Sequence, residues 1–237
     1  MYGWRGRIGV IVPSLNVTIE PEFNAMAPEG VSIHATRVLL EKGTAEALRD
    51  MAGETERAAQ LLATAGVDII AYACTTGSLV GGPGWDQELI KRIESKTNIR
   101  ATTTATAVVL ALKELAVDRL AVGTPYLEEL NQLEKAFLEA HGIKVVHIEG
   151  LGFTGASELN NLDPGVAYVL GKKVDREEAQ ALFLSCTGFQ TLEIIEALEQ
   201  DLGKPVLTSN TATLWDILRK LKVKEPVVGY GEIFHRI

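Results

Sequence analysis

Short apolar runs alternate with longer segments of helical periodicity along most of the chain. The runs at 7–12 and 67–73 have the length and composition of buried strands, and turn-forming residues follow each one. The segments at 43–65 and 127–141 carry apolar residues at helical spacing, and a glycine that can end a helix follows each. This alternation predicts an α/β fold of parallel sheets with helices on both faces.

The pattern occurs twice in the chain. Cys74 and Cys186 each lie just beyond an apolar run, and the offset of 112 residues between them also relates other positions. Further pairs at this offset are Arg7 and Arg119, Val10 and Val122, Pro13 and Pro125, and Thr75 and Thr187. An internal duplication explains these matches. We therefore predict two pseudo-symmetric lobes, each a parallel sheet flanked by helices.

The duplication also suggests how the chain is divided between the lobes. Residues 1–112 would form the first lobe and residues 113–212 the second, while the C-terminal tail, 213–237, would pack back on the first lobe. In open α/β sheets, ligands bind outside the carboxyl ends of the strands. We therefore expect the active site in the cleft between the lobes.

Cys74 and Cys186 are the only cysteines in the chain, and both follow predicted strands. Taken singly, a buried cysteine is most often a small apolar residue, but two at equivalent strand ends favour a function. A thiol there would gain acidity from the dipole of the following helix and from nearby amides. We therefore expect a nucleophilic thiolate near neutral pH and two thiols flanking one small molecule.

Hydroxyl groups are concentrated at the same predicted strand ends. They belong to Ser14, Thr75, Thr76, Ser78, Thr102, Thr103, Thr104, Thr124, Tyr126, Thr187, Thr208 and Ser209. Hydroxyls can donate to carboxylate oxygens, and they can stabilise the enediolate that forms when a proton or a carboxyl group leaves an α-carbon. The threonine runs could equally serve as helix caps and strand ends.

Composition narrows the class of partner. The chain has 237 residues, 46% of them hydrophobic, which is enough for a large core. Its net charge of −8, without a basic run, argues against nucleic acid and anionic membranes. The first apolar run is too short for a signal peptide or a membrane span, so we expect a cytoplasmic protein. Four scattered histidines predict no metal, and no cofactor is implied. The expected partner is a small carboxylate, with a homo-oligomer as a further possibility.

Four motifs resemble the aspartate/glutamate racemase superfamily. They are PSLNVTIE at 13–20, ACTTG at 73–77, TPY at 124–126 and LSCT at 184–187. Within that superfamily, the chain is most similar to the maleate cis-trans isomerases and the arylmalonate decarboxylases. Both branches are cofactor-independent, and both have two pseudo-symmetric lobes, in agreement with the duplication.

The resemblance to the maleate isomerases implies roles for individual residues. Cys74 would add to the double bond of a cis-butenedioate, and Cys186 would supply or stabilise the proton. Asn16 and Tyr126 match positions that bind the substrate carboxylates. Further donors would be Ser14, Thr75, Thr76, Thr187 and Gly188.

Other activities stay open at this stage. The segments at 151–155 and 229–234 look more like the decarboxylases, although those enzymes usually carry glycine where Cys74 stands. An asparagine of the isomerases is replaced by Ala156, unless Asn160 or Asn161 serves instead. A racemase that exchanges a proton between two thiols is a third enzymatic reading. The non-enzymatic alternative is a protein whose two lobes bind an anion without catalysing a reaction.

Overall fold

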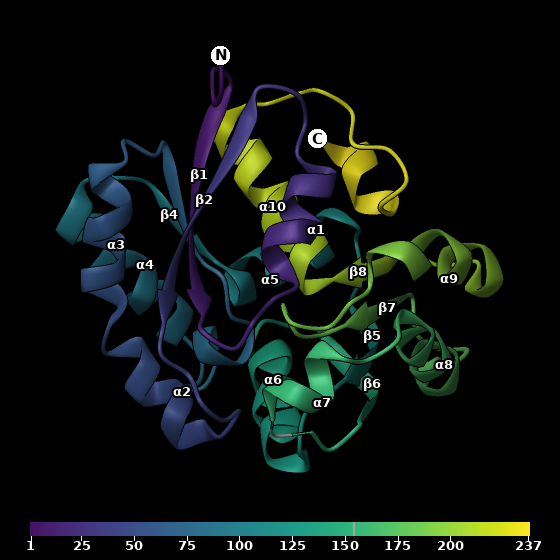
Figure 1. The fold of residues 1–237 in the computed structure, drawn as a ribbon. Coiled ribbons are helices and arrows are strands. Elements are labelled where there is room, and N and C mark those ends of the chain that lie inside the picture. Colours follow the sequence, from purple (N-terminus) through teal and green to yellow (C-terminus); the bar gives the residue numbers. More distant parts are fainter. Residues whose placement is uncertain (154) are drawn as a thin grey trace.

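The computed structural model describes residues 1–153 and 155–237, and for residues 156 and 157 the backbone alone. Within this part of the chain there are two four-stranded sheets, one from each half (Figure 1). All neighbouring strands are parallel. The orders correspond, β2-β1-β3-β4 in the first sheet and β6-β5-β7-β8 in the second. The predicted α/β fold with two pseudo-symmetric lobes is confirmed.

The first sheet has two buried central strands. Its members are β1 (Gly6–Pro13), β2 (Val31–Val38), β3 (Ile69–Tyr72) and β4 (Ala101–Thr103). β1 and β3 are buried almost throughout, as their continuous apolar sequences require, whereas β2 is a half-exposed edge strand. Ile11 lies opposite Tyr72 in the pairing of β1 with β3. Pro13 and Cys74 therefore leave the sheet side by side.

The helices of the first half are α1 (Ile19–Met26), α2 (Ala45–Ala52), α3 (Thr55–Thr64), α4 (Trp85–Thr97), α5 (Thr104–Glu114) and the short 3₁₀ helix η1 (Thr76–Ser78). α3 and α4 cover one face of the sheet (Figure 1). The single helix predicted over 43–65 is wrong, because this segment forms two helices: α2 ends just before Gly53, and α3 begins at Thr55. Glycine is a poor residue for the interior of a helix, and the break falls there.

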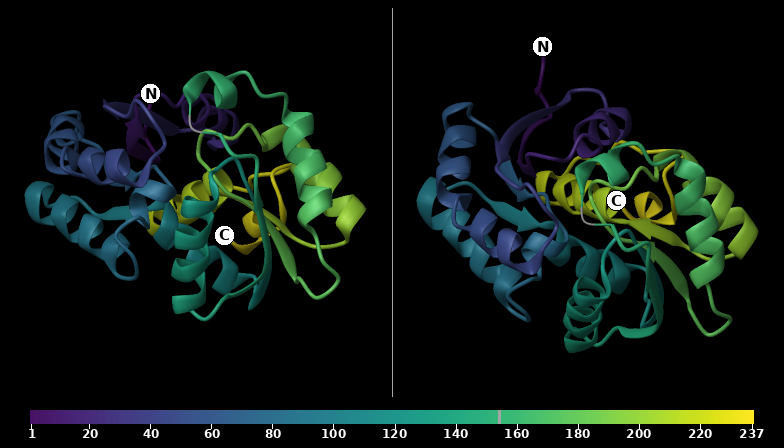
Figure 2. Two further views of the ribbon diagram at one scale, coloured as in Figure 1. Left: turned by 90° about the horizontal axis from the view of Figure 1, so that it is seen from below. Right: turned by 60° about the horizontal axis from the view of Figure 1, so that its bottom comes forward.

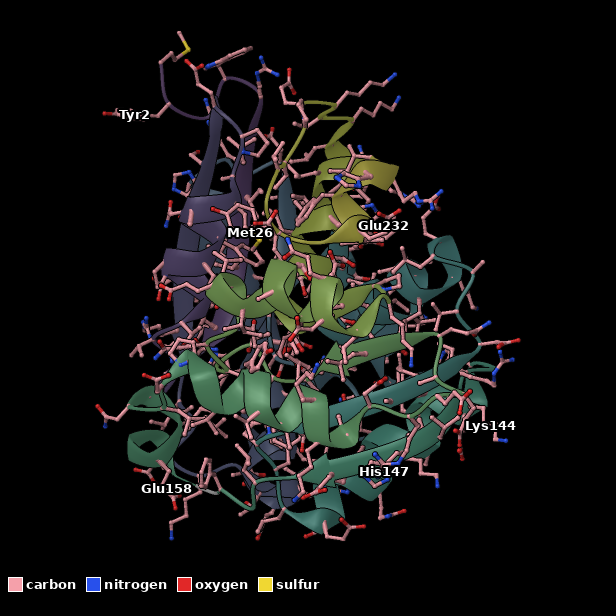
Figure 3. All side chains as sticks on the ribbon, turned by 90° about the vertical axis from the view of Figure 1, so that its right-hand side faces the viewer. Tyr2, Met26, Lys144, His147, Glu158 and Glu232 are labelled. Atoms are coloured by element: carbon pink, nitrogen blue, oxygen red, sulfur yellow. The ribbon has the colours of Figure 1, made fainter. Side chains whose placement is uncertain are left out.

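The second sheet repeats this arrangement. It comprises β5 (Arg119–Thr124), β6 (Lys144–Gly150), β7 (Ala181–Leu184) and β8 (Val206–Thr208). β5 and β7 are central, and Gly123 lies opposite Leu184, so Pro125 and Cys186 leave the sheet side by side. β6 is one of the two edge strands, and Lys144 and His147 lie along it (Figure 3).

The helices of the second half are α6 (Glu128–Ala140), α7 (Ala156–Asn160), α8 (Pro164–Val174), α9 (Ile195–Leu202) and α10 (Ser209–Leu221), with the 3₁₀ helices η2 (Leu192–Ile194) and η3 (Glu232–Arg236). The sequence also predicts a last short strand within residues 227–234, and this prediction is wrong, because the chain there is irregular up to Gly231 and then forms η3. Gly229 and Gly231 have φ angles of +92° and +101°, which turn the chain away from an extended course.

α5 and α10 join the two lobes. They pack against each other, and both contact β4 and β8 (Figure 2). One hydrophobic cluster runs through this region and includes Val10 of the first sheet, Val122 and Phe183 of the second, and Trp215 of α10. A shared core of this kind fixes the two sheets relative to each other. The ends of their central strands therefore have a defined geometry.

The segment after α10 contacts both halves. Glu225 forms an ion pair with Arg5, and the Glu232 amide donates to Glu199 Oε1 in α9 at 2.9 Å. The assignment of residues 1–112, 113–212 and 213–237 to separate lobes stays a prediction. Among the described residues, no helix combines the length and the apolar character needed to cross a bilayer.

Candidate active site

A cavity of about 70 Å³ lies between the two halves, at the carboxyl ends of the central strands. Cys74 and Cys186 both line it, together with Pro13 and Pro125. Neither cysteine is in a disulfide. One water molecule needs about 10–15 Å³ of such space, so the cavity suits a ligand of few non-hydrogen atoms. The two thiols thus reach one small enclosed space from opposite lobes.

Most of the residues predicted to bind the substrate line the same cavity. They are Asn16, Thr75, Thr76, Tyr126, Thr187 and Gly188. Ser14 is not among the lining residues, because its hydroxyl donates to the Leu40 carbonyl at 3.3 Å and accepts from the Leu40 amide at 3.0 Å. Leu40 itself lines the cavity. Ser14 therefore shapes the site through the loop after β2, and its direct contact with a substrate stays a prediction.

Cys74 follows β3 and is almost fully buried. Its Sγ accepts a hydrogen bond from the Gly77 amide at 3.3 Å and lies 3.9 Å from Thr76 Oγ1. A Cβ at residue 77 would lie 3.0 Å from this sulfur and 2.8 Å from Cε of Met51. Glycine is required there because the backbone must approach the sulfur closely.

Cys186 follows β7 with an unusual backbone conformation. Its φ is +112°, a region that residues with a side chain rarely adopt. The strain is held by two hydrogen bonds: the Cys186 amide donates to Ser209 Oγ at 2.9 Å, and the Gly188 amide donates to Cys186 Sγ at 3.3 Å. Strained backbone that surrounding contacts hold in place is frequent at functional sites.

Burial keeps both sulfurs protonated at neutral pH. It raises the pKa of the Cys74 thiol to about 12, and the nearby Cys186 adds to that shift while the Gly77 amide opposes it. Burial also raises the pKa of the Cys186 thiol, against hydrogen bonds from the Tyr126 hydroxyl and the Gly188 amide. Each thiolate would lose its solvation by water, and few donors replace it.

The expected thiolate near neutral pH is therefore wrong for both residues in this site. The expectation relied on a helix beginning directly after each cysteine. The short 3₁₀ helix η1 follows Cys74, and a turn leads from Cys186 to the equally short η2. Elements of one turn lack the aligned peptide dipoles that would stabilise a thiolate. Deprotonation must come from another group.

Asn16 and Thr187 connect the lobes beside the cavity. Asn16 Oδ1 accepts from the amides of Thr18 and Ile19 at 2.9 and 3.1 Å, which orients the start of α1. Asn16 Nδ2 donates to Thr187 Oγ1 at 3.0 Å, and the Thr187 hydroxyl donates to the Ala73 carbonyl at 3.3 Å. Asn16 keeps a second amide hydrogen, with which it could donate to a ligand.

Thr75 makes a second connection between the lobes. Its hydroxyl donates to Ser209 Oγ at 2.8 Å, and the same Ser209 oxygen accepts from the Cys186 amide. The turns that carry the two cysteines are therefore joined through one serine at the start of α10. Because the Thr75 proton is engaged, this hydroxyl holds the site together rather than offering a free donor.

Tyr126 approaches Cys186 from the loop after β5. Its side chain lines the same cavity as Cys186, and burial raises the pKa of its hydroxyl well above the usual value. The tyrosine is thus a neutral donor inside the cavity. The remaining wall is apolar and consists of Leu15, Leu40, Leu48, Leu130, Phe153 and Leu159.

Sequence reasoning missed one ionisable residue beside the site, Glu134 on α6. It is buried, and Ser185 Oγ donates to its Oε1 at 2.6 Å. A signal was present, because residue 134 falls on the apolar stripe that includes Leu130, Phe137 and Leu138. A glutamate on a buried stripe requires a partner or a proton.

Asn160 is one of the two residues that could take the place of the isomerase asparagine replaced by Ala156. Asn160 donates from Nδ2 to the Leu15 carbonyl at 2.9 Å and does not line the cavity. The side chain of Ala156 lies outside the described residues, as does Thr154 of the segment at 151–155. Asn160 therefore supports the loop that carries Leu15.

Comparisons with known proteins agree with this geometry. The curated maleate isomerase of Nocardia farcinica is 30% identical over 240 residues, which cover 97% of this chain and 96% of the relative. The arylmalonate decarboxylase of Bordetella bronchiseptica is 25% identical and covers 94% and 96%. A solved mutant of the Nocardia farcinica maleate cis-trans isomerase, with a covalently bound succinylcysteine intermediate, superposes with a TM-score of 0.93 at 28% identity, covering 98% and 99% of the chains.

These similarities confirm the resemblance seen in the motifs. They extend over nearly the whole length of each chain, so they concern the complete two-lobed fold. The family model for arylmalonate decarboxylase matches residues 8–234. The chain therefore belongs to the arylmalonate decarboxylase family, whose relatives here include maleate isomerases.

Proposed function

We propose that this protein is a cofactor-independent cis-trans isomerase of a small cis-butenedioate, with maleate as the simplest substrate. The observation that carries the proposal is the presence of Cys74 and Cys186 on one cavity of about 70 Å³. Two thiols supply the nucleophile and the proton donor that the reaction needs. We expect the protein in the cytoplasm, where thiols remain reduced.

The proposed reaction begins with addition of sulfur. Once Cys74 has lost its proton to a base, its thiolate forms an S–C bond to one alkene carbon, and the π electrons move to the neighbouring carbon and its carboxylate as an enediolate. Cys186 then donates its S–H proton to that carbon and becomes a thiolate. The product is a succinyl thioether on Cys74, the type of adduct named for the Nocardia farcinica enzyme.

Isomerisation follows because the former double bond is now single and can rotate. The Cys186 thiolate removes a proton from the same carbon, the enediolate re-forms, and its electrons expel the Cys74 thiolate. The trans acid leaves, and both sulfurs return to their starting states. No electrons are gained or lost overall, and one proton moves from Cys186 to carbon and back.

The polar lining residues would hold the two carboxylates. Asn16 Nδ2 has a second hydrogen that it can donate, and the Tyr126 hydroxyl can rotate to donate its proton. Thr76, Thr187 and Gly188 line the same cavity. Thr75 would act by maintaining the turn rather than by donating its hydroxyl proton. Hydrogen bonds to a charged group contribute about 1.5–3 kcal/mol each, enough to replace part of the lost hydration.

Decarboxylation of an arylmalonate is the second candidate. The family model and the wall formed by Leu40, Leu48, Leu130 and Phe153 favour it, because an aryl group needs apolar contacts. In that reaction Cys186 alone would protonate the enediolate left by carbon dioxide. The cavity volume favours the smaller dicarboxylate, and Cys74 would have no role in decarboxylation.

Proton NMR in deuterated water distinguishes these activities. Maleate and phenylmalonate are supplied in turn to the protein and to its Cys74→Ser and Cys186→Ser variants. We expect conversion of maleate to its trans isomer, and a loss of about 10²-fold or more in either variant. Phenylmalonate turnover that survives in Cys74→Ser would favour the decarboxylase instead. Deuterium exchange into a chiral acid would indicate a racemase, and binding without turnover would indicate a binding protein.

A further inference from the structure

The amide of Gly77 is the backbone group that donates to the Cys74 sulfur, at 3.3 Å. Thr76 Oγ1 lies farther from this sulfur, at 3.9 Å. Burial raises the pKa of the Cys74 thiol, and the hydrogen bond from the Gly77 amide opposes that shift. A buried thiolate is stabilised by the donors that replace its lost hydration. The position of one glycine amide therefore matters for any reaction in which Cys74 becomes a thiolate.

The carbonyl of Gly77 is held by a side chain from outside the turn. The carbonyls of Cys74, Thr75 and Thr76 accept from backbone amides three or four residues onward. The Gly77 carbonyl instead accepts from Nε1 of Trp85, the first residue of α4, at 3.0 Å. Glycine has more backbone freedom than any other residue, so a bond that fixes its carbonyl also limits where its amide can point.

The indole of Trp85 is itself fixed by the loop that leads to α4. A Cβ on Gly81 would lie 2.5 Å from Cδ2 of the indole, so the ring packs directly on the backbone there. The Trp85 amide donates to the Gly82 carbonyl at 3.1 Å. The partly buried ring also packs against the hydrophobic cluster that contains Cys74. These contacts keep Nε1 beside the Gly77 carbonyl.

We propose that Trp85 is a positioning residue for Cys74. Its indole N–H holds the Gly77 carbonyl, and the Gly77 amide, fixed in this way, donates to the sulfur as negative charge develops on it. Trp85 is not among the described residues that line the cavity, so it acts through the turn and does not touch the substrate. The proposal involves two hydrogen bonds in series and no transfer of atoms or electrons.

This inference rests on the proposed function, in which Cys74 becomes a thiolate twice in each turnover. The first time is before the sulfur adds to the alkene, and the second is when elimination expels it. A donor that is already in place stabilises the developing charge without a rearrangement at that moment. A Gly77 amide that moved freely would have to be ordered at each of these steps. Trp85 supplies that order in advance.

The test is alkylation of Cys74 by iodoacetamide in the full-length Cys186→Ser variant, in which Cys74 is the only cysteine. The rate at about pH 9, followed by mass spectrometry, reports the thiolate population. Addition of Trp85→Phe retains a ring but removes the N–H, and it should slow alkylation about fivefold, the order expected for one hydrogen bond. A turn that merely loosened would expose the sulfur and speed the reaction. An unchanged or faster rate would therefore overturn the proposal.

Access of the reagent to the cavity is controlled through the other cysteine. In the Cys74→Ser variant, Cys186 is the only thiol, and it lines the same cavity. Its sulfur accepts from the Gly188 amide, which Trp85 does not hold. Trp85→Phe should therefore leave the alkylation rate of Cys186 unchanged. Slower reaction of both cysteines would mean a narrower entrance and would contradict the proposal.

Trp85→His separates the hydrogen bond from the packing of the ring. The imidazole matches the five-membered part of the indole, with Nε2 in place of Nε1, so a ring N–H donor is retained while the six-membered part is lost. We expect Cys74 in this variant to be alkylated at a rate close to that found with Trp85. If the ring served only to pack the loop, this smallest ring would expose Cys74 most and give the fastest reaction, which would contradict the proposal.

Turnover supplies a second readout. With both cysteines present, Trp85→Phe should lower kcat about tenfold with little change in KM, and Trp85→His should restore part of that loss. A histidine variant slower than the phenylalanine variant would show that ring bulk matters and would refute the role of the N–H. Trp4→Phe is the matched control, since Trp4 is 54% exposed and should leave kcat unchanged.

The two readouts separate this inference from the proposed function. Alkylation requires no substrate, so it decides on Trp85 even if maleate is not turned over. Circular dichroism of each variant identifies loss of folding. If Trp85→Phe does not fold, Trp85→His decides by itself: a Cys74 alkylation rate close to that found with Trp85 supports the proposal, and a clearly slower or faster rate contradicts it.

Discussion

The hydroxyl of Thr75 in the first lobe donates to the hydroxyl of Ser209 at the start of α10. Ser209 also accepts from the Cys186 amide, so one oxygen joins the turns of both cysteines. The structure therefore couples the positions of the two sulfurs through backbone and hydroxyl groups rather than through the sulfurs themselves.

Replacement of Ser209 by alanine should weaken both turns. It leaves the Thr75 hydroxyl and the Cys186 amide without an acceptor, and each buried unsatisfied group costs about 1–3 kcal/mol. We expect a lower free energy of unfolding in urea and a lower kcat, since Cys186 loses the bond that holds its strained backbone. Ser95→Ala, on exposed α4 surface, is the control. Unaltered stability in Ser209→Ala would show that the shared hydroxyl is not a support of the site.

Alkylation of Cys74 in the Cys186→Ser variant should be slow at neutral pH. Because burial raises its pKa to about 12, the rate should climb about tenfold per pH unit beyond the usual thiol value of about 8.5. The sign follows from burial, which disfavours the charged form. A rate that reached its plateau at about pH 8.5 would contradict the raised pKa. The unfolded variant in denaturant, which should show that ordinary plateau, serves as the reference.

The sequence predicts the central parts of this fold well. The strands that precede Cys74 and Cys186 are continuous apolar runs, and continuous runs are what burial on both faces of a sheet requires. The edge strand β2 was missed. Its apolar residues alternate with polar ones such as Ser32 and His34, a weaker pattern that follows from exposure at the edge of the sheet.

The site could be predicted in its residues but not in its electrostatics. Strand ends and the duplication place Cys74 and Cys186 together, since equivalent positions of facing lobes meet in one cleft. The acidity of the thiols depends instead on burial and on which donors contact each sulfur. Neither can be predicted from the residues next to each cysteine in the sequence. Ser209 accepts from the Cys186 amide and Glu134 accepts from the preceding Ser185, and tertiary packing alone brings these distant residues there.

Glu22 should contribute strongly to the joining of the lobes. From α1 it accepts hydrogen bonds from the amides of Thr191 and Leu192 at 3.0 and 3.2 Å and from Asn210 Nδ2 at 2.6 Å. Glu22→Ala would leave these donors unsatisfied, and we expect a loss of about 1–3 kcal/mol in urea unfolding. Glu20→Ala, which removes a partly exposed ion pair with Arg37, should cost about 1 kcal/mol or less. Equal effects of the two substitutions would argue against the bridging role of Glu22.

The pH dependence of unfolding gives Glu22 a second test. Burial raises its pKa in the folded protein, so its contribution to stability is complete below the unfolded value of about 4.5 and declines as the pH rises through the folded value. Glu22→Gln cannot ionise and should show a smaller decline over that acidic range, measured by urea unfolding at several pH values. A decline as steep as that of the unaltered protein would assign the titration to another group, of which the more deeply buried Glu134 is the first to examine by Glu134→Gln.

The backbone of Cys186 should reverse the usual preference between alanine and glycine. At a φ of +112° a Cβ is strained, so Cys186→Gly should be more stable than Cys186→Ala by about 1 kcal/mol, although glycine loses more entropy on folding. Both variants lack the thiol, so the comparison isolates the backbone. Cys74 has no positive φ, and there Cys74→Ala should be the more stable of the matched pair. Thermal unfolding of the four variants measures both differences, and the same order at the two positions would mean that Cys186 is not strained.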